Sequence, residues 1–222
     1  AIAAVGPRYT SNHHGRGKID VLDPVFEMPT DGVTDSGAAW TRIAALLTGL
    51  GVGGSVMIPC GTYVVNSTSP IISLTDVNNV TIRGTGFNCT FLRQSGTGNG
   101  MSFIRSISTG IRNLTLQDFT LVYDGTSTIP QGIYGVDVIE GTFERINVAN
   151  FKNHQVNLTG NDQGHSVIRD SRFTCGTASV AGSAGVRITG GQHQMTQNNY
   201  FNIGGLTASN WDRCENGLDV RG

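Results

Sequence analysis

The chain has 222 residues, enough for one sizeable domain with its own core, and only 14% of them are charged. The formal net charge of −1 argues against a nucleic-acid partner, whose binders carry basic stripes, and against electrostatic anchoring to a membrane. No apolar run approaches the roughly 20 residues that a transmembrane helix needs, so we expect no membrane insertion.

Glycine is unusually frequent, at 31 of 222 residues, which indicates many turns in a packed, β-rich chain. The four cysteines form no CxxC pair and lack metal-ligand spacing, and the glycine stretch at 51–54 lacks the Gly-Lys-Ser/Thr of a phosphate loop. We therefore expect neither a metal nor a cofactor. Because the cysteines lie inside strand-like runs, buried free thiols are favoured over disulfides, although their even number leaves disulfides open.

In chain order, residues 1–30 show no period and are expected to form an extended lead-in to one domain over 31–222. Asp35 or Ser36 suits a helix N-cap, and the glycine-rich stretch 49–54 suits a helix stop. Between them the apolar residues recur at helical spacing: Trp40, Ile43, Ala44 and Leu47. This pattern predicts a helix over 36–48.

Two short strands are expected next, over 55–59 and 62–65, and then short apolar alternations recur between turn residues. Four runs share one pattern: 136–139, 156–159, 186–189 and 218–221. Each of the first three is followed by a second short strand and a polar turn. In the clearest units a third strand-like run follows the turn. Each unit therefore resembles one coil of three strands, which must stack on its neighbours to bury its inward face.

Stacking the coils in this register separates the first-strand residues into columns. Two columns are apolar and face inward: Val136, Val156, Val186 and Leu218, and beside them Val138, Leu158, Ile188 and Val220. One column is polar and faces outward: Asp137, Asn157, Arg187 and Asp219. The separation predicts an all-β fold, a parallel β-helix with coils from about residue 55 onward.

The segment from Thr30 to Trp40, TDGVTDSGAAW, and the segment from Gly53 to Val64, GGSVMIPCGTYV, resemble the N-terminal signature of the pectate-lyase superfamily. Trp40 replaces the usual aliphatic residue, and Ser36 stands where a second Asp is common. The resemblance implies a right-handed parallel β-helix whose open end is capped by the α-helix. It also implies a carbohydrate ligand.

Among proteins with this opening, the first choice is a phage tailspike or tail-fibre β-helix, a virion tail protein that assembles as a homotrimer. Such a protein recognises a bacterial surface polysaccharide, capsule or O-antigen, and either only binds it or also degrades it as a hydrolase or lyase. The start lacks a signal peptide, the cysteines look free, and the pattern stops mid-coil at Leu218–Gly222, so the β-helix is expected to be incomplete there. Two alternatives stay open: a non-enzymatic structural or adhesive virion β-helix, and a secreted pectate-lyase-like lyase or hydrolase.

The densest candidate site lies near the last predicted strand. Asp219 is expected beside Arg187 of the adjacent coil, where an arginine can bind a sugar carboxylate. The preceding loop adds Trp211 as a stacking platform, with Asp212 and Glu215. We predict Asp219 and Glu215 as the catalytic pair. The predicted substrate-binding residues are Arg187, Trp211, Asp212, Asn157 and Asp137. The alternative interpretation is a surface ion pair under an exposed loop.

Other polar residues are expected to have structural duties. Asp118, Asp170 and Asn198 end second strands, where Asp and Asn commonly make turns. Glu144, Arg145 and Arg169 are expected to form an external ladder of ion pairs across adjacent coils.

Overall fold

The computed structural model describes residues 17–50, 53–106, 111–160, 164–176, 183–190, 195–202 and 216–221. Its helices are η1 (Pro24–Phe26), a 3-10 turn, and α1 (Gly37–Leu50). The strands of the first half are β1 (Lys18–Asp20), β2 (Gly54–Ile58), β3 (Gly61–Val65), β4 (Ile72–Thr75), β5 (Val80–Gly84), β6 (Thr90–Gln94), β7 (Met101–Ile104), β8 (Ile111–Arg112) and β9 (Thr115–Tyr123). Those of the second half are β10 (Ile133–Val136), β11 (Val138–Ile139), β12 (Thr142–Ala149), β13 (His154–Thr159), β14 (Val167–Arg169), β15 (Arg172–Thr174), β16 (Ala184–Thr189), β17 (Met195–Gln197), β18 (Tyr200–Asn202) and β19 (Asn216–Arg221).

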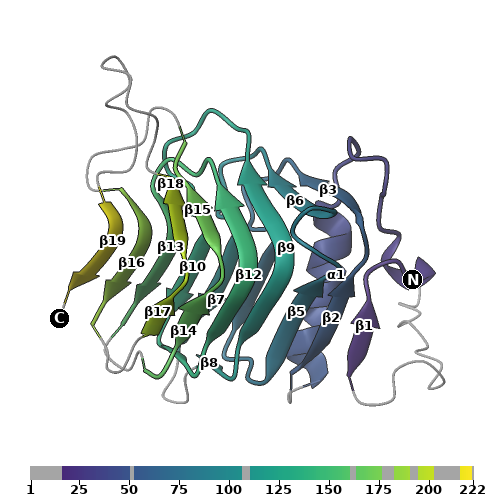
Figure 1. Cartoon of the computed structure of the whole chain (residues 1–222). Coiled ribbons are helices and arrows are strands. Elements are labelled where there is room, and N and C mark those ends of the chain that lie inside the picture. Colours follow the sequence, from purple (N-terminus) through teal and green to yellow (C-terminus); the bar gives the residue numbers. More distant parts are fainter. Residues whose placement is uncertain are drawn as a thin grey trace.

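These strands stack in parallel into a β-helix, which confirms the predicted fold class (Figure 1). Face 1 is the sheet β4-β7-β10-β13-β16-β19. Face 2 runs through β1, β2, β5, the first halves of β9 and β12, β14 and β17. Face 3 runs through β3, β6, the second halves of β9 and β12, β15 and β18. The right-handed winding stays a prediction.

The corner between faces 2 and 3 is a single residue in the left-handed backbone conformation. Asp118, Asp170 and Asn198 hold it with φ of 62°, 51° and 51°, which confirms their predicted turn duty. Arg145 holds the same place in its coil, with φ of 50°. One coil before Asp118, Gly84 ends β5 at this corner, where an added Cβ would lie 2.2 Å from the Asp118 carbonyl oxygen.

The predicted external ladder of ion pairs is present along this corner. Arg145 contacts both Glu144 and Asp118, and its Nε lies 2.7 Å from the Asp118 carboxylate. Arg169 reaches Glu144 from the next coil at 3.0 Å. On the other side, Arg83 of β5 lies 3.2 Å from Asp118 of β9, so the ladder extends two coils further than expected.

The N-terminal end is closed by α1, which contacts the first strand of face 1, β4 (Figure 1). Trp40 is 1% exposed and packs edge-on against Tyr63 of β3, with ring centroids 6.2 Å apart, as the predicted cap requires. The Ser36 carbonyl accepts the Trp40 N–H at 3.1 Å, so of the two N-cap candidates Ser36 holds the position, and the Asp35 carboxylate accepts the Gly37 N–H at 3.0 Å. The helix runs slightly longer than the predicted 36–48.

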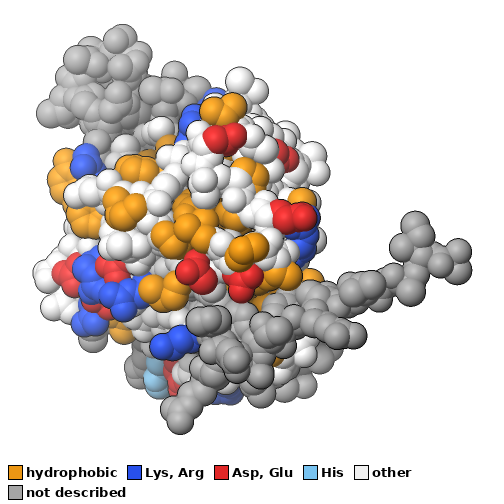
Figure 2. Space-filling view, turned by 90° about the vertical axis from the view of Figure 1, so that its right-hand side faces the viewer, with side chains coloured by type: hydrophobic (Ala, Val, Ile, Leu, Met, Phe, Trp, Pro, Cys, Tyr) orange, Lys and Arg blue, Asp and Glu red, His pale blue; other side chains and the backbone are white. Residues whose placement is uncertain are grey.

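The stretch expected as an extended lead-in over 1–30 joins the sheet from Lys18 on. Strand β1 pairs in parallel with β2, and Ile19 is buried opposite Val56. Figure 2 looks onto this end of the molecule, where hydrophobic side chains gather at the surface. Leu22, Val25 and Met57 are among the exposed apolar residues of β2 and the segment just after β1.

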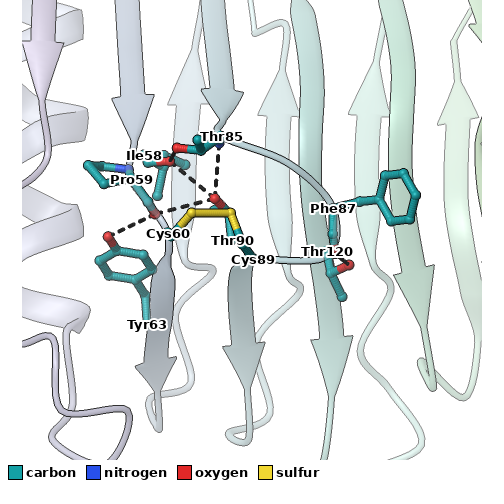
Figure 3. The surroundings of a disulfide bond; sticks show 9 residues. All are labelled: Ile58, Pro59, Cys60, Tyr63, Thr85, Phe87, Cys89, Thr90 and Thr120. Atoms are coloured by element: carbon teal, nitrogen blue, oxygen red, sulfur yellow. Dashed lines mark hydrogen bonds between the residues drawn. A yellow bond between two sulfur atoms is a disulfide. The ribbon is translucent and has the colours of Figure 1, made fainter.

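The expectation of free thiols was wrong. Cys60 and Cys89 form a disulfide, with Cα atoms 4.8 Å apart (Figure 3), and Cys175 is disulfide-bonded as well. Cys60 and Cys89 directly precede Gly61 and Thr90, which pair in the register of β3 with β6. Stacked coils place such residues at the ladder spacing, which lies within the Cα range of disulfides. The sequence hides this pairing because the two positions belong to different coils.

Candidate functional site

A polar column runs along the outward surface of face 1, and β10, β13, β16 and β19 supply one residue each. The register pairs Tyr134 with Asn157, Asn157 with Arg187, and Arg187 with Asp219. Arg187 points outward, because side chains alternate along a strand and its two neighbours, Val186 and Ile188, are both buried. This confirms the predicted orientation of β16.

Asp137 does not belong to this column, and its predicted place was wrong. The true first strand of that coil is β10, so Tyr134 holds the outward position and Ile133 and Gly135 the inward ones. Asp137 lies in the turn after β10, with φ of 52°, and its carboxylate lies 3.6 Å from Arg105. The error arose because Gly135 breaks the apolar alternation. Leu158 and Val138 fill the space that a Gly135 side chain would take, each 2.8 Å from its Cβ position.

The predicted pair of Arg187 and Asp219 is brought together. The Arg187 Nε lies 3.4 Å from the Asp219 carboxylate, and the side chains are 24% and 12% exposed. Arg221, on the same strand as Asp219, adds a second guanidinium at 2.9 Å. The Arg221 hydrogen bond, together with the charges of Arg221 and Arg187, lowers the pKa of Asp219. This carboxylate is therefore ionised wherever the protein works near neutral pH.

His154, which the sequence interpretation missed, lies beside this pair. It is the first residue of β13, and the Ala184 N–H donates to its Nδ1 at 3.0 Å. Its Nε2 lies 2.9 Å from an Arg187 NH group. Burial and then the charge of Arg187 lower the pKa of His154 to about 4, while Asp219 acts in the opposite direction. The ring is therefore neutral at pH 7. Because its Nδ1 accepts the Ala184 N–H, its Nε2 carries the proton, so His154 packs beside Arg187 without accepting a hydrogen bond from it and without adding a charge.

Several buried polar atoms of this column make no well-oriented hydrogen bond within the described part of the chain. They are the Asn157 Oδ1, the Arg187 Nε and the Asp219 Oδ2. The Asn157 amide nitrogen, in contrast, donates to Gln131 at 2.7 Å. The Arg187 Nε and the Asp219 Oδ2 face each other in the ion pair, so their charges are paired. The Asn157 Oδ1 lacks a partner among the described residues and is free to accept a hydrogen bond from a ligand.

Trp211, Asp212 and Glu215 lie outside the described residues, so the structure places only Arg187, Asn157 and Asp219 of the predicted set on one surface. His154, Gln131, Tyr134 and Arg221 were missed. Arg221 could have been found as the next polar residue of β19, because Asp219 and Arg221 alternate with the apolar Leu218 and Val220. Within the described ranges, no group of His, Cys, Asp and Glu side chains could hold a metal ion. No helix there is long and apolar enough to cross a bilayer.

No family model and no curated relative matches the sequence. Solved structures do resemble it. ORF18 of Geobacillus virus E2 aligns with a TM-score of 0.65 and 18% identity over 90% of this chain and 40% of that protein. The mannuronan C-5 epimerase A-module of Azotobacter vinelandii aligns with a TM-score of 0.60 and 17% identity, over 91% of this chain and 62% of that protein. The pre-mature gene product 12 of bacteriophage phi29 aligns with a TM-score of 0.59 and 16% identity, over 91% of this chain and 32% of that protein.

The chain therefore spans less than two thirds of each of these proteins. At these identities the similarity establishes a common parallel β-helix architecture. The chain shares its fold with phage proteins and with a carbohydrate-modifying enzyme domain.

Proposed function

We propose that this chain is part of a phage tailspike or tail fibre that binds a bacterial surface polysaccharide along the outward surface of face 1. The observation that carries the proposal is the column Asn157–Arg187–Asp219, with its partly exposed ion pair and with an Asn157 Oδ1 that has no hydrogen-bond partner among the described residues. Adjacent coils repeat at about 4.8 Å, so such a column offers polar contacts at regular steps along an extended sugar chain.

The charges of the column favour an acidic sugar. Arg187 and Arg221 flank the single carboxylate of Asp219, and the neutral His154 leaves this balance unchanged. A uronic-acid or other sugar carboxylate can pair with a guanidinium in bidentate geometry. The resemblance to phage proteins and to a mannuronan epimerase supports a virion setting and a polysaccharide ligand. Homotrimeric assembly is part of this proposal and is checked by light scattering of the full-length protein.

If the site also cleaves its ligand, Asp219 suits the role of base, nucleophile or electrostatic stabiliser. Its lowered pKa keeps it ionised, so it cannot serve as the general acid. Glu215, four residues earlier in the chain, is the partner that we propose for the acid role. A binding-only, adhesive function is the second candidate, and the engagement of Asp219 by two arginines favours it.

The test uses Asp219→Asn, Glu215→Gln and Arg187→Ala in the full-length protein, assayed for binding and depolymerisation of acidic capsular polysaccharides. Asp124→Asn and Arg169→Ala are matched controls, because both residues form ion pairs elsewhere on the β-helix. Removing Arg187 leaves Asp219 with one partner, so we expect binding to weaken by about 10-fold to 100-fold. Cleavage that is lost in Asp219→Asn with binding retained makes Asp219 catalytic. Full binding and full activity in all three variants would place the function elsewhere.

A further inference from the structure

Two exposed aromatic side chains from distant parts of the sequence line one groove at the corner of faces 2 and 3. Phe87 is 46% exposed and Tyr200 is 57% exposed, and among the described residues they are the aromatic side chains that are most open to solvent. The groove has a volume of about 490 Å³, within the usual range of ligand sites. It lies away from the Asp219 column, which is on face 1.

The Phe87 side of the groove is a braced loop between β5 and β6 (Figure 3). The Cys60–Cys89 disulfide ties the end of this loop to the neighbouring coil, and the Thr90 N–H donates to the Gly86 carbonyl at 2.9 Å. Thr120 of β9 donates its hydroxyl to the Phe87 carbonyl at 2.6 Å. In Figure 3 the Phe87 ring points away from the disulfide, toward the later coils. The backbone that carries this exposed ring is thus fixed before any ligand arrives.

Strand pairing positions the Tyr200 side. Tyr200 begins β18 and pairs in register with Arg172 of β15, whose guanidinium lies 5.1 Å from the centroid of the Tyr200 ring. Arg172 in turn pairs with Asn147 of β12, so the three residues form one outward column on face 3. The cation–π contact holds the ring in place at the surface.

Polar groups complete the lining. The Asn147 Oδ1 is buried and accepts no hydrogen bond from a described residue, although the Asn147 amide nitrogen donates to Thr120 at 3.4 Å. Asn198 donates to Asp170 at 3.3 Å, so an amide and a carboxylate lie at the rim. The groove holds one cation, Arg172, and one anion, Asp170, and its formal charge is therefore balanced.

This chemistry matches the two sides of a sugar. A pyranose ring presents an apolar C–H face that packs on an aromatic ring, and an edge of hydroxyls that bonds amides and carboxylates. A protein partner fits less well, because most residues that line the groove besides Phe87, Ile146 and Tyr200 are polar or charged: Asn147, Asp170, Ser171, Arg172 and Asn198.

We propose that this groove is a second glycan-binding site, which takes a neutral stretch of an oligosaccharide between Phe87 and Tyr200. The inference rests on the proposed function in taking a glycan as its ligand class, but it assigns a different surface and a different charge type. The site on face 1 binds sugar carboxylates, whereas this groove binds uncharged rings.

The test measures binding of two probe sets by isothermal titration: neutral oligosaccharides, such as cellohexaose and the neutral O-antigen fragments of an array, and acidic alginate oligomers. We compare wild type with Phe87→Ala, Tyr200→Ala and the double variant. Each single change should weaken neutral-glycan binding about threefold to tenfold, as expected for loss of one aromatic contact. Acidic-glycan binding should not change in these variants.

Three controls separate the outcomes. Ile129→Ala removes an exposed apolar side chain outside the groove and should bind as wild type does. Tyr200→Phe should keep neutral-glycan binding, whereas Tyr200→Leu, which retains bulk without a ring, should weaken it as much as Tyr200→Ala does. Arg187→Ala should weaken acidic-glycan binding alone. The proposals for face 1 and for the groove are therefore tested independently of each other.

The proposal is overturned if the double variant binds every neutral glycan as tightly as wild type, or if wild type binds none of them. It is also overturned if the double variant changes the oligomeric mass in light scattering, because the groove would then be a subunit contact.

Discussion

The first coil and the last described strand differ in how their inward residues are buried. At the N-terminal end α1 and β1 cover the first coil, so Trp40 and Ile19 are each 1% exposed. In the last described strand the inward residues Leu218 and Val220 are 42% and 62% exposed. A coil buries its inward face only against a neighbour or a cap, and among the described strands β19 has a neighbour, β16, on one side alone.

The ends also differ in what their residues do. The disulfide of Cys60 with Cys89 and the helical cap stabilise the N-terminal coils. The later coils carry Arg187 and Asp219, which pair with each other at the outward surface of face 1, and the neutral His154 beside them.

The largest expected effect concerns the cap. Trp40→Ala removes a buried indole that packs on Tyr63, so the free energy of unfolding should fall by about 3–5 kcal/mol. Leu50→Ala, at an exposed position of the same helix, is the matched control and should cost little. Denaturant unfolding measures both. Equal stability of Trp40→Ala and wild type would mean that α1 does not close the core.

A matched pair in one column tests the comparison most sharply. Ile188 and Val220 are register partners, but Ile188 is 1% exposed and Val220 62% exposed. Ile188→Ala should cost about 2–4 kcal/mol of unfolding free energy and Val220→Ala less than about 0.5 kcal/mol. A large cost for Val220→Ala would show that this end is covered in solution.

The disulfide should contribute somewhat less. It closes a loop with a sequence separation of 29, so replacing both Cys60 and Cys89 by alanine should lower the free energy of unfolding by roughly 2–3 kcal/mol. The measurement is denaturant unfolding without reductant. If the double variant unfolds at the same denaturant concentration as wild type, the bond does not stabilise the first coils.

The smallest effect is a pH dependence from the later coils. His154 has a pKa of about 4 in the folded chain, below its ordinary 6.5. Between pH 6.5 and 4 the unfolded chain takes up a proton that the folded chain refuses, so stability falls as the pH falls through this window. We expect a loss of roughly 2 kcal/mol after solvent screening, and His154→Asn should flatten the curve. The exposed His165→Asn is the control. If the free energy of unfolding of His154→Asn falls with pH as steeply as that of wild type, the lowered pKa of His154 is contradicted.

The fold could be predicted because its signals are local. The cap spacing around Trp40, the turn residues Asp118 and Asp170, and the alternation in β16 all follow from neighbouring residues. What failed depends on contacts between coils. Gly135 hid the register of β10 because other coils fill its place, and the pairing of Cys60 with Cys89 becomes visible only when β3 and β6 are stacked.

The candidate site was predictable to the same extent. Arg187 and Asp219 were paired correctly because β16 and β19 share an unbroken alternation. His154 was missed because it precedes the alternating part of β13, and its role arises from burial against the next coil. Asp137 was misplaced together with the register of β10.

The central claim is that a polysaccharide lies along the outward surface of face 1, and a crystal structure of the full-length protein with a bound acidic oligosaccharide tests it most directly. We predict a sugar carboxylate within hydrogen-bonding distance of Arg187 or Arg221, and sugar hydroxyls at Asn157 and Asp219. A saccharide bound elsewhere, with this column still in contact with solvent, would contradict the account.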